Sequence, residues 1–165
     1  MILRALARAR ARRGAGRRRR VLAISSGGGH WVELLRLRAA FDGHELVWCT
    51  VSEAYRIQVP GERFHTVRDV TRWDRLGLLA CAGEVLTVLL QVRPDVVVST
   101  GALPGFFGVL LGKALGARTI WLDSLANVEE LSMSGRRVGP LADLWLTQWR
   151  ELARPEGPLY RGAVV

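Results

Sequence analysis

Near its N-terminus the chain reads Val21-Leu22-Ala23-Ile24-Ser25-Ser26-Gly27-Gly28-Gly29-His30. The apolar run predicts a buried strand, because it is short and ends in small residues. The glycines predict a tight turn, and apolar residues from Trp31 to Phe41 then recur at helical spacings up to Asp42-Gly43. This stretch therefore predicts a strand, a glycine loop and a helix.

The same alternation continues to the end of the chain. Strands are predicted over 45–50, 63–67, 95–99, 118–123 and 144–148, helices over 74–92 and 105–115, and a polar loop or short helix over 124–135. The run Val96-Val97-Val98 favours a strand buried on both faces, as in parallel sheets covered by helices. We therefore expect an α/β protein with a Rossmann-like open parallel sheet and helices on both faces.

Length and charge divide the chain into two parts. Its 165 residues favour one domain. The net charge of +9 comes entirely from nine arginines before Val21, and residues 21–165 carry 15 basic and 15 acidic groups. We therefore expect a folded domain over 21–165 with no bias towards nucleic acid. Residues 1–20 are expected to form a basic tail, either a solvated extension or a short amphipathic helix on an anionic membrane surface.

The cysteines and apolar segments exclude several classes of protein. Cys49 and Cys81 lie in apolar stretches without a C-x-x-C spacing, which suits buried thiols in a reducing cytoplasm. The most apolar segment, 76–90, falls short of 18 residues and contains Glu84, so we expect no membrane span. The helix over 74–92 is instead expected to be mostly buried. No secretory signal is recognisable.

Ligands of such sheets gather beyond the carboxyl ends of the strands. Three of these ends carry small or polar residues: Ser25-Ser26-Gly27-Gly28-Gly29-His30, Ser99-Thr100-Gly101-Ala102 and Asp123-Ser124. The glycines allow close backbone approach, and the start of the following helix presents free N–H groups and a positive dipole, which predicts a phosphate or diphosphate ligand. Ser99, Thr100 and Gly101 would place small donors opposite. The alternative is that the glycines only form a turn.

His30 stands at the start of the helix that follows the glycines. A neutral imidazole there could accept a proton from a hydroxyl held beside bound phosphate. It could equally cap the helix or donate to the phosphate itself. The residues alone do not separate these roles.

Nucleotide-binding fingerprints fit the chain poorly. A G-x-G-x-x-G pattern started at Gly27 meets Val32 where the third glycine should stand, and no P-loop lysine follows the loop. One alternative is still a dinucleotide-binding protein that uses Gly27 and Gly29 for a cofactor and Glu53 for its ribose. A second is a noncatalytic interaction protein that acts through the basic tail.

The order and spacing of several motifs resemble one family. They are Ser25-Ser26-Gly27-Gly28-Gly29-His30 with Glu33-Leu34-Leu35, Arg93-Pro94-Asp95 running into Ser99-Thr100-Gly101-Ala102, Asp123-Ser124-Leu125-Ala126, Leu131-Ser132 with Ser134-Gly135, and Ala142-Asp143 with Gln148-Trp149. From Val21 onward the chain resembles the membrane-associated, acceptor-side subunit of the two-subunit N-acetylglucosaminyltransferase of lipid-linked oligosaccharide synthesis and its capsule and exopolysaccharide relatives. More distantly it resembles the amino-terminal half of the lipid-linked transferase of peptidoglycan synthesis. It departs from the pattern at Asp123, where glutamate is usual, and at Asn127, where arginine is common.

The resemblance implies the acceptor-binding, amino-terminal half of a GT-B glycosyltransferase. The partner would be a small subunit that binds the nucleotide sugar, UDP-GlcNAc or a UDP-hexuronate, and the acceptor a polyprenyl-diphosphate-linked sugar. Ser25 to Gly29, Ser99 to Gly101, Asp123 and Ser124 would bind the acceptor, and His30 would contact phosphate or act as the base. Gln148 and Trp149 would lie at the subunit interface. No cofactor or metal ion is implied, and the protein would be cytoplasmic and peripheral at the inner face of the plasma membrane.

Overall fold

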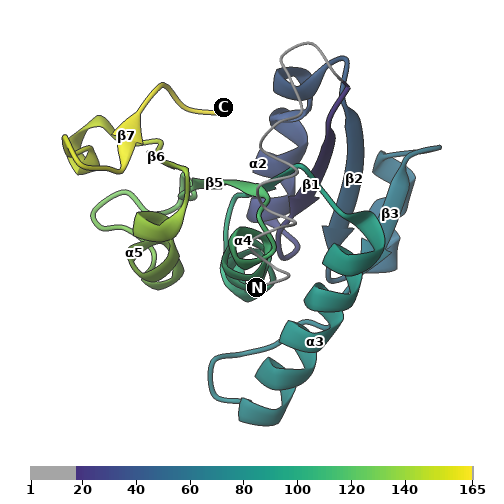
Figure 1. Cartoon of the computed structure of the whole chain (residues 1–165). Helices are drawn as coiled ribbons and strands as arrows, with labels where there is room; N and C mark the ends of the chain where they lie inside the picture. The colour runs from purple at the N-terminus through teal and green to yellow at the C-terminus, as the bar shows by residue number, and fades with distance from the viewer. Residues whose placement is uncertain (1–17, 165) are drawn as a thin grey trace.

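Seven strands form one parallel sheet in the computed structural model, which describes residues 18–164 (Figure 1). The strands are β1 Arg20–Ile24, β2 Glu45–Thr50, β3 Arg63–Thr66, β4 Val96–Ser99, β5 Arg118–Leu122, β6 Leu144–Thr147 and β7 Leu159–Tyr160. The helices are α2 Gly29–Arg36, α3 Arg75–Val92, α4 Ala102–Ala114 and α5 Met133–Val138, with 3₁₀ turns at Arg38–Phe41, Glu53–Gln58 (η2), Gly139–Leu141 and Arg150–Leu152.

Helices cover both faces of the sheet, as the bare apolar strands predict. Alternate residues of β1 separate into two cores, with Leu22 and Ile24 packed on the α3 and α4 side and Val21 and Ala23 on the α2 side. Each core also takes one face of β2, so these central strands are buried on both sides. The expected Rossmann-like parallel sheet is confirmed.

The strand order β3-β2-β1-β4-β5-β6-β7 decides where a ligand can bind. The chain moves outward from β1 to β3, crosses through α3 to β4 on the other side of β1, and then moves outward again to β7. The order therefore reverses between β1 and β4, and their carboxyl ends diverge to leave a crevice in folds of this kind. The loops after these two strands are the glycine loop and the Ser99-Thr100-Gly101 segment.

Three sequence predictions are wrong in detail. The last strand is β7 rather than 144–148. Helix α4 begins at Ala102 instead of residue 105, because Pro104 is compatible with the first turn of a helix, where its missing N–H has no intrahelical partner. Arg20 belongs to the sheet rather than the tail: it pairs with Glu45 (2.9 Å) and donates to the carbonyl of Val92 (2.7 Å).

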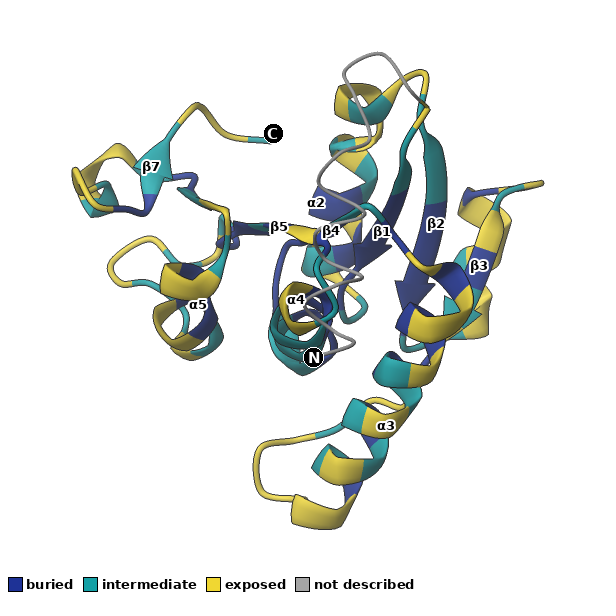
Figure 2. Ribbon diagram, in the orientation of Figure 1, coloured by how far each residue is buried: buried dark blue, intermediate teal, exposed yellow. Residues whose placement is uncertain are grey.

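Helix α3 differs most from expectation. Six of its 18 residues are buried, so the prediction of a mostly buried helix is wrong. In Figure 2 its outer side and N-terminal end are exposed. Within residues 18–164 it is the one helix long and apolar enough, by length and composition, to cross a membrane, which corrects the expectation that this segment is too short. The same test is passed by helices that only pack on a core, and α3 does so through Cys81, Val85 and Leu89.

The expectations for the thiols and the tail have different outcomes. Cys49 and Cys81 are both buried and free, as expected. Burial raises the pKa of both thiols, that of Cys81 to about 11. The predicted basic tail covers residues 1–20, of which residues 1–17 lie outside the described part of the chain. Arg18, Arg19 and Arg20 are described, and Arg20 is the first residue of β1.

Candidate functional site

The three predicted loops lie together at the carboxyl edge of the sheet. The hydroxyl of Thr100, after β4, donates to the carbonyl of His30 at 2.7 Å. The hydroxyl of Ser124, after β5, donates to Oε1 of Glu33 on α2 at 2.8 Å. Segments about 70 and 90 residues apart in sequence are therefore tied to the same short helix.

The glycine loop leaves open space around the start of α2. Gly28 is the N-cap, with φ of 63°, and no side chain caps the helix. A Cβ built on Gly28 or Gly29 would meet no atom within 4 Å. The first amides of a helix have no intrahelical acceptor, so this end presents free N–H groups towards unfilled space. An anion fits such a place electrostatically.

His30 sits between the two loops. A Cβ on Gly101 would lie 2.6 Å from Cε1 of His30 and 2.7 Å from its Nδ1, so the imidazole packs directly against the backbone of the β4 loop. Nδ1 is buried without a hydrogen-bond partner among the described residues. The absence of a side chain at position 101 is thus what allows the ring to lie there.

Most of the predicted hydroxyl donors are used within the protein. Ser25 donates to the carbonyl of Ser26 (2.9 Å), while Ser99 accepts from the amide of Gly101 (3.1 Å). Ser25, Ser99 and Thr100 are fully buried. Their observed role is to hold the loops in place, and the free groups nearest the opening are main-chain amides.

Asp123 organises its own loop. Its carboxylate accepts from the amide of Ser124 (3.1 Å), Nδ2 of Asn127 (2.7 Å) and the amide of Ser132 (3.2 Å). Burial raises the pKa of the Asp123 carboxyl, although the hydrogen bonds from Ser132, Asn127 and Ser124 oppose the shift. The carboxylate therefore points into the loop after β5, and Asn127 is one of the groups that hold it.

Glu33 is a central residue to which the sequence assigned no role. Its side chain is 7% exposed. Oε1 accepts from Ser124 and from the amide of Leu125 (3.1 Å), and Oε2 accepts from Nε2 of Gln148 (3.1 Å). It joins α2, the β5 loop and the end of β6. The available signals were its place in the Glu33-Leu34-Leu35 part of the family motif and its position three residues after His30.

Gln148 and Trp149, expected at a subunit interface, contact the body of the protein in this structure. Gln148 is 3% exposed, and its Oε1 accepts from the amide of Val164 (2.9 Å), which fixes the end of the described chain. Nε1 of Trp149 donates to the carbonyl of Leu125 (2.8 Å). Both side chains therefore hydrogen-bond to the β5 loop, Gln148 at the carbonyl of Asp123 and Trp149 at that of Leu125.

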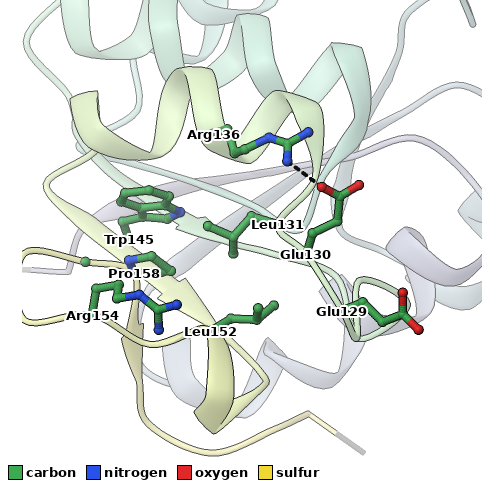
Figure 3. Close-up of a pocket in the computed structure, with 9 residues that line it drawn as sticks. Glu129, Glu130, Leu131, Arg136, Trp145, Leu152, Arg154 and Pro158 are labelled. Atoms are coloured by element: carbon green, nitrogen blue, oxygen red, sulfur yellow. Dashed lines mark hydrogen bonds and ion pairs between the residues drawn. The ribbon is translucent and has the colours of Figure 1, made fainter.

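A separate pocket of about 410 Å³ lies at the β6–β7 side of the molecule (Figure 3). Trp145, Leu152 and Pro158 form its apolar wall, and Arg136 and Glu130 pair at its rim (2.6 Å). No residue of the glycine loop lines it. Among the described residues no group of three or more His, Cys, Asp or Glu side chains could hold a metal ion.

Comparison with protein-family models finds no match. Among curated proteins the chain is similar to the UDP-N-acetylglucosamine transferase subunit ALG14 of Eremothecium gossypii, with 27% identity over 86% of this chain and 77% of that protein. It is also similar to the subunit of the same name from Cryptococcus neoformans, with 38% identity over 48 residues, which are 29% of this chain and 21% of that protein. The second alignment thus spans about a fifth of that relative.

Among solved structures the fold matches MurG of Acinetobacter baumannii, with a TM-score of 0.72, 12% identity, and coverage of 88% of this chain and 45% of that chain. It also matches UDP-N-acetylglucosamine 2-epimerase of Rickettsia bellii, with a TM-score of 0.66, 15% identity, and coverage of 90% and 46%. The chain spans less than half of either structure. The architecture is that of the amino-terminal half of a GT-B glycosyltransferase. The expected fold and resemblance are confirmed, and the relatives support the expectation of a glycosyltransferase subunit.

Proposed function

We propose that this chain is the acceptor-binding subunit of a split GT-B glycosyltransferase. Its acceptor would be a sugar linked to a polyprenyl diphosphate, and its donor UDP-GlcNAc or a UDP-hexuronate bound by a second polypeptide. The observation that carries the proposal is the open, uncapped start of α2 at the point where the strand order reverses. The relatives named as transferase subunits support a partner chain.

The acceptor diphosphate would bind at the glycine loop. The amides at the start of α2 would donate to phosphate oxygens, and the helix dipole would favour their negative charge. The packed β4 loop, with Gly101 against His30, would form the opposite wall. In this role the protein would hold the lipid-linked sugar so that its hydroxyl faces the donor in the partner subunit.

The surroundings of His30 favour phosphate contact over base chemistry. A base must present an unprotonated Nε2, which places the proton on Nδ1 in the neutral ring. That proton would then be buried without an acceptor, since Nδ1 has no partner among the described residues. The other tautomer buries an unpaired lone pair on Nδ1 instead of an unpaired proton, and it makes Nε2 a donor, which suits a phosphate oxygen.

Sugar transfer by the reconstituted pair tests the proposal. We expect no transfer from UDP-GlcNAc to a polyprenyl-diphosphate-linked sugar by this chain alone, and transfer when it is coexpressed with a small nucleotide-sugar-binding partner. Gly29→Asp should abolish transfer, because it places an acid beside the phosphates. The same change should leave stability unaltered or raise it by about 0.3 to 1 kcal/mol, because an acid is favourable at a helix N-terminus.

Gly29→Ala is the matched control, since position 29 has room for a Cβ. It should retain transfer. Robust transfer by the chain alone, or full activity of Gly29→Asp, would refute the proposed function. Gly28→Asp should be inactive as well, but the φ of 63° at that position adds backbone strain and makes it a less specific test.

An exposed apolar patch supports attachment to a membrane surface. Trp73, Leu76 and Leu79, at the start of α3, are 79%, 80% and 72% exposed. Arg72 stacks over the Trp73 ring at 4.5 Å and Arg75 is exposed beside it. Because α3 leads from the carboxyl end of β3 back across the sheet, its N-terminal end lies at the same edge as the glycine loop (Figure 1). We therefore propose that the protein lies peripherally on an anionic membrane with this edge towards the lipid.

Vesicle sedimentation tests this orientation. The double variant Leu76→Ser/Leu79→Ser should bind vesicles of phosphatidylglycerol and phosphatidylcholine about tenfold more weakly than the parent protein, since each change removes an apolar side chain from the lipid interface. Leu141→Ser, at a 51% exposed leucine beside α5, is the control and should bind normally. Equal binding by all three proteins would show that this patch does not contact lipid.

A further inference from the structure

Tyr55 lies directly over the glycine loop, on the turn η2 that follows β2. Its hydroxyl accepts a hydrogen bond from the amide of Gly28 at 2.8 Å. A Cβ on Gly27 would lie 2.7 Å from the same oxygen. The phenol therefore touches two of the three glycines, at the mouth of the proposed diphosphate site.

The ring of Tyr55 is held firmly in this position. It packs on Trp31, with ring centroids 5.3 Å apart, and Trp31 is fully buried. Nε1 of Trp31 donates to Oε1 of Gln58, at the other end of η2, at 2.8 Å. Ser52 caps the turn by accepting from the amide of Ala54 (3.3 Å). These contacts fix η2 against the first turn of α2, so the hydroxyl is preorganised beside the loop.

The hydroxyl still has a proton to donate. A phenol oxygen that accepts one hydrogen bond retains its own O–H, and the bond from Gly28 polarises that O–H and strengthens it as a donor. The bond lies on the exposed side of the loop. The Gly28 amide already donates to Tyr55. An anion at the start of α2 would therefore contact the Tyr55 hydroxyl instead of this amide.

We infer that Tyr55 is a further acceptor-binding residue, whose hydroxyl relays the Gly28 amide to a diphosphate oxygen. This inference rests on the proposed function and adds a second side-chain donor, beside His30, to a site otherwise built from main-chain amides. It gives the turn η2 a role in ligand binding, although this turn belongs neither to the glycine loop nor to the β4 loop. If Tyr55 only filled the space over the glycine loop, its side chain would have to move away before phosphate could bind there.

Calorimetric titration of the full chain with farnesyl diphosphate, and separately with inorganic pyrophosphate, tests the inference. Tyr55→Phe keeps the ring and its packing on Trp31 but removes the donor. It should weaken binding of both ligands about tenfold, as expected for loss of one hydrogen bond to a charged group, with an unchanged melting temperature. Tyr160→Phe removes the only other tyrosine hydroxyl, on β7, and should bind like the parent protein.

The outcomes separate this inference from the proposed function. If Gly29→Asp weakens binding while Tyr55→Phe binds as tightly as the parent, Tyr55 is not a contact and the inference fails alone. Tighter binding by Tyr55→Phe would identify the hydroxyl as a plug and would overturn it too. If the parent protein binds neither ligand, or Gly29→Asp binds equally well, the diphosphate site itself is wrong.

Discussion

The loops after β1 and β5 lie at the same edge of the sheet, but they use their polar groups in opposite ways. Around Gly28 and Gly29 there is open space, and the Tyr55 hydroxyl that accepts from the Gly28 amide retains its own O–H. The β5 loop is hydrogen-bonded throughout: Asp123 accepts from three groups of that loop, and Glu33 ties it to α2. The comparison shows that one loop has donors left for a ligand, whereas the other uses its donors to keep its shape.

Removal of Glu33 should break the rigid side of this comparison and have the largest effect on stability. Glu33→Ala leaves the Ser124 hydroxyl and the Leu125 amide without their buried acceptor, and it leaves Nε2 of Gln148 with the carbonyl of Asp123 alone. We expect a loss of about 3 kcal/mol, or roughly 6 to 12 °C in melting temperature. Thermal unfolding followed by circular dichroism measures it.

Glu53→Ala is the matched control, because that carboxylate is 61% exposed and pairs with Arg56 on the surface. Its loss should change stability by less than about 1 kcal/mol. Equal melting temperatures for the two variants would show that the β5 loop does not depend on Glu33.

Gly101→Ala should disturb the contact between the β4 loop and His30. The new Cβ would lie 2.6 Å from the imidazole, at a backbone φ of 144° that side chains rarely adopt. A loss of about 1 to 3 kcal/mol is expected from strain and displacement of the ring, with weaker farnesyl diphosphate binding. Gly83→Ala, in α3 with no atom within 4 Å, should instead stabilise the protein by about 0.5 to 1 kcal/mol. Stability changes of the same sign in both variants would contradict this account of the β4 loop.

The smallest effect concerns the pH dependence of the β5 loop. Burial raises the pKa of Asp123 above its ordinary value of 3.8, so the folded protein binds more protons than the unfolded chain between 3.8 and the raised value. Stability from this group therefore falls as the pH rises through that window. In Asp123→Asn this decline should disappear. Urea titrations at several pH values measure it.

Asp143→Asn should change the pH dependence of stability in the opposite direction. Burial of Asp143 is outweighed by hydrogen bonds from Lys113 and Thr119, which lower its pKa. The contribution of Asp143 to stability is present above its ordinary pKa of 3.8 and is lost as the pH falls through its lowered pKa. This variant should therefore lose stability at neutral pH and become less sensitive to acid. The same pH slope in both variants would refute the difference assigned to the two carboxyls.

Most strands were predictable because they contain a short apolar run between turn residues, as in Glu45–Thr50, whose middle residues Leu46 to Cys49 are apolar and which the structure confirms. Strand β7 was not, because Leu159–Tyr160 is too short to show a pattern. The exposed side of α3 was missed because apolar residues surround the helix, and composition alone does not reveal that its first turns project beyond the core.

At the site, sequence identified the segments that meet but not the partners within them. Parallel topology brings the carboxyl ends of β1, β4 and β5 together, so Gly28, Thr100 and Ser124 were predictable as neighbours. The Thr100 hydroxyl donates to a carbonyl within the protein, and the Ser99 hydroxyl accepts from the Gly101 amide. These bonds depend on side-chain rotamers, which a sequence does not show. Tyr55 lies 27 residues from Gly28, in a turn without a recognisable motif.

In the proposed function, the amides at the start of α2 bind a lipid carrier's diphosphate. An ¹⁵N-labelled sample titrated with farnesyl diphosphate and followed by amide chemical shifts tests it most directly. We expect the largest shifts at Gly28, Gly29 and His30, with smaller ones at Thr100 and Gly101, and almost none in the β6–β7 pocket. Shifts confined to that pocket, or none at the glycine loop at saturating ligand, would contradict it.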